Sequence, residues 1–221
     1  MSVLMRPLLV VALLLQATFS YADTSRFVTG IEYQEIIPAQ LTRAPKGKIE
    51  VVELFWYGCP HCYRLEPALE KWRKTMPDNI DFIRMPAQFN KSWEIHAAAY
   101  YTAESLGLTE KTHMAIFKEM HEKKKKLNTV DELAAFFLNY GVSREKFTKV
   151  FNSFAVRNRQ AHAKGMGQRY GAHSVPTFVI NGKYRTNETM AGSKKDMFAV
   201  IEELVEAEAK AGQEKQVDKQ P

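Results

Sequence analysis

The sequence predicts an α/β fold in which one mixed β-sheet is interrupted by an all-helical insertion. β-branched and aromatic runs typical of buried strands occur at residues 49–56 and again at 177–180. Between them, residues 92–170 carry apolar side chains at helical spacing. The 221 residues are 45% hydrophobic and 25% charged, which is typical of a globular protein and excludes a disordered or fibrous one.

The first segment, residues 1–22, has the pattern of a cleaved signal peptide. Arg6 supplies the positive charge, residues 8–15 are an apolar run, and Ala22 offers a small residue at the cleavage position. The apolar run is too short to span a bilayer comfortably, although an uncleaved N-terminal anchor is the alternative. We therefore expect a mature protein of residues 23–221 in an exported, oxidising compartment.

Residues 23–87 form the expected first part of the sheet domain. After an extended segment at 33–37, the strand at 49–56 is followed by a helix at 59–74 and a second strand at 80–85. A strand, helix and strand at this spacing form a βαβ unit, whose two strands are parallel.

Residues 88–166 form the expected helical insertion, with four or five helices. Thr129 and Glu132 match a capping box, which marks a helix start. Apolar residues at helical spacing predict a further helix that continues through Phe154.

Residues 167–221 form the expected second part of the sheet domain. The strand at 177–180 leads into Asn181-Gly182, the signature of a two-residue hairpin turn. Ser193 can cap a final amphipathic helix, and a polar tail follows from residue 211.

The chemistry-bearing motif is Cys59-Pro60-His61-Cys62, which holds both cysteines of the chain at the junction of a strand and a helix. Proline is tolerated at the first helical position. The helix start presents free N–H groups and partial positive charge to Cys59, which favours the thiolate, and His61 acts in the same direction. Cys62 lies close enough to form a disulfide, and we expect it to be the more buried sulfur. Stabilising the Cys59 thiolate makes the disulfide a stronger oxidant.

Two other interpretations of the cysteine pair stay open. One is a structural disulfide, although so short a loop contributes only about 2 kcal/mol. The other is half of a metal site, which would need ligands from elsewhere in the chain. Neither a metal nor an organic cofactor is expected.

Val175-Pro176 is a second candidate site. A proline is compatible with the first residue of a strand, so simple strand punctuation is one explanation. A cis peptide bond would be the functional explanation, because it would turn neighbouring backbone groups toward an incoming chain.

Together, the run from Val52 to Cys62 and the run from Ser174 to Tyr184 resemble the DsbA family of periplasmic thiol:disulfide interchange proteins, a branch of the thioredoxin superfamily. The resemblance extends over essentially the whole mature chain. It implies a thioredoxin fold with an inserted all-helical domain and a location in the periplasm. An acidic thiol and an oxidising disulfide are established features of this family, so the resemblance implies both for Cys59 and Cys62.

The resemblance also implies residue roles. Cys59 is the implied exchanging sulfur and Cys62 the resolving one, with Pro60 and His61 tuning the redox potential. Val175 and a cis Pro176 form the implied loop where substrate backbone docks. Glu53 matches a buried acid that assists proton transfer to Cys62, while an ordinary solvated or edge carboxylate is the alternative.

The implied activity is donation of the Cys59–Cys62 disulfide to newly exported, unfolded polypeptides by a monomeric enzyme. Reoxidation by a quinone-linked inner-membrane partner of the DsbB type is also implied. The alternatives are a disulfide isomerase or reductase with the same cysteines, and a non-enzymatic peptide-binding chaperone. The charge of +6 is dispersed, so nucleic-acid binding is not expected. The histidines other than His61 lack metal-ligand spacing and are interpreted as surface or packed residues.

Overall fold

The computed structural model describes residues 25–217, and the expected signal peptide lies outside this range. A five-stranded mixed sheet forms the centre of the molecule, with the strand order β1-β5-β4-β2-β3. The strands are β1 (Gln34–Glu35), β2 (Ile49–Phe55), β3 (Ile80–Pro86), β4 (Thr177–Ile180) and β5 (Tyr184–Thr186). The α/β fold predicted from the strand pattern is therefore confirmed.

The predicted βαβ unit is formed by β2, α1 (Pro60–Arg73) and β3, and its two strands are parallel. Strand β4 joins the other edge of β2 in the antiparallel direction. Asn181 and Gly182 have positive φ values of 50° and 64°, so they form the turn that returns the chain along β5. The sheet places the start of α1 beside the segment that leads into β4.

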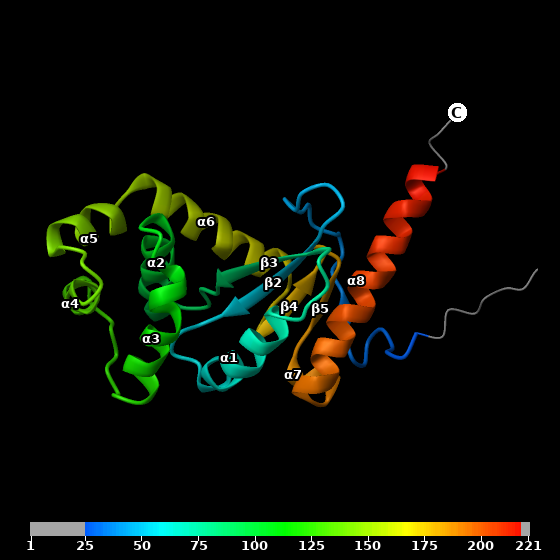
Figure 1. Cartoon of the computed structure of the whole chain (residues 1–221), viewed down its shortest axis with the longest axis horizontal. Helices are drawn as coiled ribbons and strands as arrows, with labels where there is room; N and C mark the ends of the chain where they lie inside the picture. The colour runs from blue at the N-terminus through cyan, green and yellow to red at the C-terminus, as the bar shows by residue number, and fades with distance from the viewer. Residues whose placement is uncertain (1–24, 218–221) are drawn as a thin grey trace, which may run out of the picture.

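Five helices lie between β3 and β4, and they gather at one end of the molecule (Figure 1). They are α2 (Lys91–Ser105), α3 (Thr109–His121), α4 (Val130–Leu138), α5 (Arg144–Phe151) and α6 (Phe154–Arg169). The capping box of Thr129 and Glu132 is present at the start of α4. Helix α6 runs back from the helical end to the sheet, and the expected domain boundary at residue 166 lies inside it.

The helix predicted to continue through Phe154 instead ends at Phe151. Ser153 starts the next helix, because its side chain accepts a hydrogen bond from the backbone N–H of Val156. Phe154 consequently begins α6 and is 76% exposed rather than packed in the core. The helix predicted from the apolar spacing is therefore confirmed as far as Phe151 and wrong beyond it.

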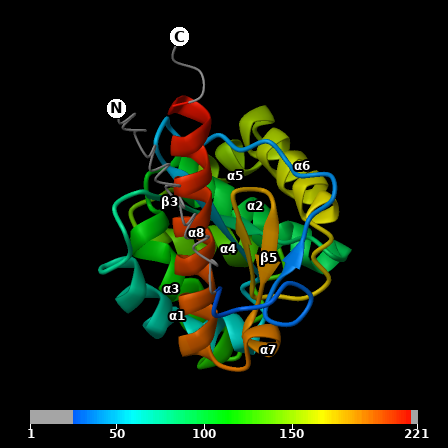
Figure 2. The ribbon, with the colours of Figure 1, turned by 90° about the vertical axis from the view of Figure 1, so that its right-hand side faces the viewer.

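Within the described residues, two helices follow the hairpin, α7 (Glu188–Ala191) and α8 (Lys194–Val217). Ser193 caps α8, since its hydroxyl accepts from the N–H of Asp196 at 3.0 Å. Because α8 continues to Val217, the expected polar tail is helical as far as that residue. Figure 2 shows α8 lying along the sheet on the side away from the helical insertion.

The core is divided between the two faces of the sheet. On one face, Val51, Phe178 and Ile180 pack with apolar residues of α1 and α8. On the other, Val52 and Val179 pack in a larger cluster that continues into the helical insertion. Among the described residues, no helix is both long and apolar enough to cross a membrane.

Candidate active site

The redox motif lies where the chain leaves β2 and enters α1. Cys59 is the N-cap of α1, with an extended backbone at φ −84° and ψ 117°, and Pro60 occupies the start of the helix. The N–H of Cys59 donates to the carbonyl of Trp56 at 2.9 Å, which closes the turn. The predicted position of the cysteine pair at a helix start is thus confirmed.

The two cysteines are free thiols that differ in exposure. Cys59 retains 7% of its surface exposed, whereas Cys62 is completely buried at 0%. The expected greater burial of Cys62 is confirmed. An approaching sulfur atom can therefore reach only Cys59 without displacing other residues.

Several groups lower the pKa of Cys59. A hydrogen bond with the Cys62 side chain contributes most, followed among the favourable effects by the backbone N–H groups of Cys62 and His61 and by the charge of His61. Burial opposes these effects, and the pKa falls from an ordinary 9.0 to about 6. The helix start and His61 act as the sequence predicted, but the neighbouring thiol is the larger influence because it points its S–H at the sulfur anion.

Cys62 behaves in the opposite way. Burial raises its pKa well above the usual 9.0, and the hydrogen bond to Cys59 and the negative charge of Glu53 raise it further. At neutral pH the pair therefore holds one anionic sulfur at the surface and one protonated sulfur inside.

The segment before β4 faces this pair. The Val175–Pro176 peptide bond is cis, as the family resemblance implies. The carbonyl oxygen of Val175 lies 3.4 Å from the Cys59 sulfur, within hydrogen-bonding range for a thiol. His61 is exposed beside the pair, and Arg64 donates to its Nδ1 atom at 3.2 Å.

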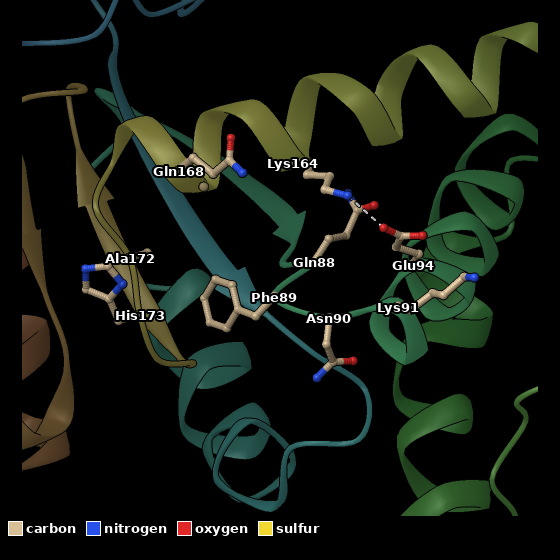
Figure 3. A pocket seen from close by; sticks show the side chains of 10 residues that line it. Gln88, Phe89, Asn90, Lys91, Glu94, Lys164, Gln168, Ala172 and His173 are labelled. Atoms are coloured by element: carbon tan, nitrogen blue, oxygen red, sulfur yellow. Dashed lines mark hydrogen bonds and ion pairs between the residues drawn. The ribbon is translucent and has the colours of Figure 1, made fainter.

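A cavity of about 540 Å³ opens next to this loop. Phe89, from the connection between β3 and α2, and His173, from the segment leading to Val175, both line it (Figure 3). Lys164 on α6 and Glu94 on α2 form an ion pair of 2.8 Å at its edge. The cavity therefore joins the loop that faces Cys59 to the helical insertion.

Glu53 is wholly buried at 0% exposure, which excludes the alternative of a solvated or edge carboxylate. It is paired in register with Arg84 of β3, and both side chains project toward α1. Burial and the charge of Glu66 raise the pKa of Glu53 to about 8, although Arg84 opposes the increase. At neutral pH Glu53 is mostly a protonated carboxylic acid.

Sequence reasoning missed three further buried polar residues around Glu53, namely Glu66 on α1, Arg84 on β3 and His113 on α3. Arg84 could have been noticed in the sequence, because it follows the apolar residues Ile80 and Phe82 at alternating positions that share one face of the strand. Glu66 and His113 could not be recognised as buried from the sequence, since polar residues are ordinary on amphipathic helices.

Two other histidines of the insertion hold the residues before the motif. His96 accepts a hydrogen bond from the indole N–H of Trp56 at 2.9 Å. The Nε2 atom of His121 lies 2.8 Å from the carbonyl oxygen of Tyr57 and donates to it. The redox turn is therefore attached to the helical insertion as well as to the sheet. In the described part of the chain, no cluster of three or more histidine, cysteine or acidic side chains is arranged to hold a metal ion.

Comparison with known proteins agrees with this geometry. A family model described as a DSBA-like thioredoxin domain matches residues 80–205. The thiol:disulfide interchange protein DsbA of Pseudomonas aeruginosa is 39% identical over 209 residues, covering 94% of this chain and 99% of that protein. The protein of the same name from Azotobacter vinelandii is 38% identical over 203 residues, covering 86% and 95%.

Solved structures show the same relationship. The crystal structure of Pseudomonas aeruginosa DsbA has a TM-score of 0.80 at 40% identity and covers 85% of this chain and 97% of that one. The structure of DsbA from Xylella fastidiosa has a TM-score of 0.76 at 34% identity, with coverages of 82% and 97%. The helical insertion and the interrupted sheet are thus those of a thioredoxin fold, and the chain belongs to the DsbA family of thiol:disulfide interchange proteins.

Proposed function

We propose that this thiol:disulfide oxidoreductase oxidises the thiols of exported, unfolded polypeptides by donating its Cys59–Cys62 disulfide. The observation that carries the proposal is the asymmetry of the pair. Cys59 is the more accessible sulfur and has a pKa of about 6, whereas Cys62 is buried with a raised pKa. Stabilising the thiolate stabilises the reduced enzyme, so the oxidised enzyme gives up its disulfide readily.

The exchange takes two steps. A substrate thiolate attacks Cys59 in the disulfide, the bond to Cys62 breaks, and Cys62 leaves as a thiolate that takes up a proton. A second thiolate of the substrate then attacks the substrate sulfur of the mixed disulfide, and Cys59 leaves as a thiolate. The substrate loses two electrons in forming its disulfide. The enzyme gains them when its Cys59–Cys62 disulfide is reduced to two separate cysteines.

Glu53 is the proposed proton donor to Cys62. A thiolate at Cys62 is strongly disfavoured by burial, so it needs a proton as it leaves. The Glu53 carboxyl is mostly protonated at neutral pH and lies near enough for its charge to act on Cys62. In the reverse direction the same group takes the proton back.

The Glu53→Gln variant is expected to slow disulfide donation by about 100-fold, the lower end of the effects seen when a general acid or base is removed. It is also expected to lose the change in rate near pH 8 that accompanies titration of Glu53. Stopped-flow oxidation of a peptide dithiol across the neutral and alkaline range measures both effects.

The control is Glu50→Gln. Glu50 is also buried on β2, but its carboxylate accepts from the N–H of Arg43 on the other side of the sheet. The control should keep the pH profile of the wild-type protein. An unchanged profile in Glu53→Gln as well would remove Glu53 from the mechanism.

The substrate backbone is proposed to dock on Val175 and the cis Pro176, beside the Cys59 sulfur. A carbonyl that already lies 3.4 Å from that sulfur can also accept a backbone N–H of the incoming chain. The adjoining cavity offers room for a side chain next to the substrate cysteine. Pro60 and His61 are exposed on the same surface, where they tune the redox potential and meet the substrate.

The cellular setting follows from the family. DsbA proteins act on substrate proteins in the periplasm and interact with DsbB. For this chain we propose export through cleavage of residues 1–22, action as a monomer, and reoxidation by a quinone-linked inner-membrane protein of the DsbB type.

The decisive measurement is the redox equilibrium with glutathione, combined with alkylation of Cys59 across pH. We expect an oxidising potential and an alkylation midpoint of about pH 6. A lowered thiolate pKa stabilises the reduced form above the midpoint, so oxidising strength relative to glutathione should decline as the pH falls through about 6. A pair that remains oxidised in reducing buffer, with an unreactive Cys59, would favour a reductase or a structural disulfide instead.

A further inference from the structure

A continuous chain of buried side chains connects the helical insertion to the acid beside Cys62. The Tyr57 hydroxyl lies 3.1 Å from Nδ1 of His113, and Nε2 of His113 lies 3.0 Å from Oε1 of Glu66. Arg84 donates to the other oxygen of Glu66 at 2.9 Å and to Glu53 at 3.2 Å. All five residues are at most 8% exposed. His113 is the member supplied by the insertion, on α3.

The neighbours of His113 determine which of its nitrogens carries hydrogen. Burial lowers the pKa of His113, so its ring is neutral at neutral pH. A neutral ring has one donor and one acceptor. The Tyr57 hydroxyl can donate to Nδ1, which leaves Nε2–H to donate to Glu66. The opposite tautomer would direct a nitrogen lone pair at a carboxylate oxygen.

The cluster contains two wholly buried carboxyl groups but one buried guanidinium. Ionising both Glu53 and Glu66 beside Arg84 would leave excess negative charge in the interior, which is costly. One of the two acids must therefore retain a proton. The charged and titratable groups that face them are Glu70 and Arg73 of α1, Tyr57 before it, Tyr100 of α2, and the redox cysteines.

The hydrogen bonds decide between the two acids. Glu66 accepts from Arg84 on one oxygen and from His113 on the other, and donors on both oxygens favour a carboxylate. Among the described residues, Glu53 accepts only from Arg84, and its Oε1 atom is buried without a hydrogen-bond partner. The proton therefore belongs on Glu53.

We propose that His113 is a positioning residue that keeps Glu66 ionised and thereby leaves the shared proton on Glu53, next to Cys62. The inference rests on the proposed role of Glu53 in proton transfer. It gives the helical insertion a part in the redox chemistry, because the N–H that selects the protonated acid comes from α3.

The test is the titration of the Glu53 carboxyl carbon by NMR in full-length mature protein labelled with carbon-13 at glutamate side-chain carboxyls. The oxidised form is used, since neither sulfur titrates in it, and the Glu53→Gln spectrum assigns the signal. In wild-type protein Glu53 should titrate well above its ordinary 4.5. In His113→Leu the proton settles on Glu66, so the Glu53 midpoint should fall by about one pH unit or more.

Three further variants separate this role from loss of packing. His113→Gln retains an N–H for Glu66 and an oxygen for Tyr57, so the high midpoint should return. Glu66→Gln should lower the midpoint as His113→Leu does, because it removes the charge beside Glu53. His96→Leu removes another buried histidine that contacts no carboxylate within the described chain, and it should leave the Glu53 midpoint unchanged.

The outcomes distinguish the two proposals. An unchanged Glu53 midpoint in a folded His113→Leu variant overturns the inference, whatever Glu66→Gln shows. If His113→Leu does not fold, an unchanged Glu53 midpoint in Glu66→Gln, or a midpoint in His113→Gln that falls below the wild-type value, still overturns the inference. If the Glu53 midpoint moves while the pH profile of disulfide donation does not, His113 positions the proton as stated and the proposed role of Glu53 fails.

Discussion

Replacing Cys59 with serine is expected to reduce disulfide donation to the uncatalysed rate, since a serine hydroxyl can neither form the disulfide nor accept the substrate sulfur. Replacing Cys62 has a different result. Cys59 alone still forms mixed disulfides, but no neighbouring thiol remains to resolve them. The oxidation rate of a reduced peptide dithiol measures the first outcome, and non-reducing electrophoresis after incubation with an oxidised peptide measures the second.

The residue placed at position 62 should also control the acidity of Cys59. The Cys62 side chain is the largest influence lowering the pKa of Cys59. In Cys62→Ala that donor is lost, so the alkylation midpoint of Cys59 should rise from about 6 toward 9.0. Cys62→Ser retains a hydroxyl donor and should remain closer to the wild-type midpoint. Equal midpoints in the two variants would show that the helix start, rather than the neighbouring side chain, sets the acidity.

The largest effect on stability is expected from Arg84→Met. Arg84 is the buried cation between Glu53 and Glu66, and its side chain is 5% exposed. Removing one partner of a buried ion pair typically costs about 3–5 kcal/mol, because the remaining charge is left uncompensated. Urea unfolding at neutral pH measures the loss.

The pH dependence of that loss has a definite sign. The acids left without Arg84 can avoid the penalty by holding protons, and they do so more completely as the pH falls. The destabilisation should therefore shrink in acid. Arg159→Met is the matched control, because Arg159 pairs with Glu104 on the surface and such pairs contribute about 0–1 kcal/mol. A loss of similar size in both variants would contradict the buried-pair explanation.

Local sequence determined the parts of the site that lie close together along the chain. The start of α1 holds Cys59, Pro60 and Cys62. The helix begins there because a glycine follows the strand and a proline is favoured at the first helical position. The strands, the hairpin turn at Asn181-Gly182 and the cap at Ser193 followed from equally short patterns. The helix around Phe154 did not, because a single serine capping bond outweighed the apolar spacing.

Only the tertiary structure determined which of the buried acids at the site holds a proton. Glu53 lies opposite Arg84 because β2 and β3 pair in one register, which no local pattern specifies. His113 reaches Glu66 only because α3 packs against α1, although 47 positions separate the two residues. A local motif can place a thiol at a helix start, where its acidity depends on the side chain and the backbone N–H groups of the same turn. The charge of a buried acid depends on every group that the fold brings around it.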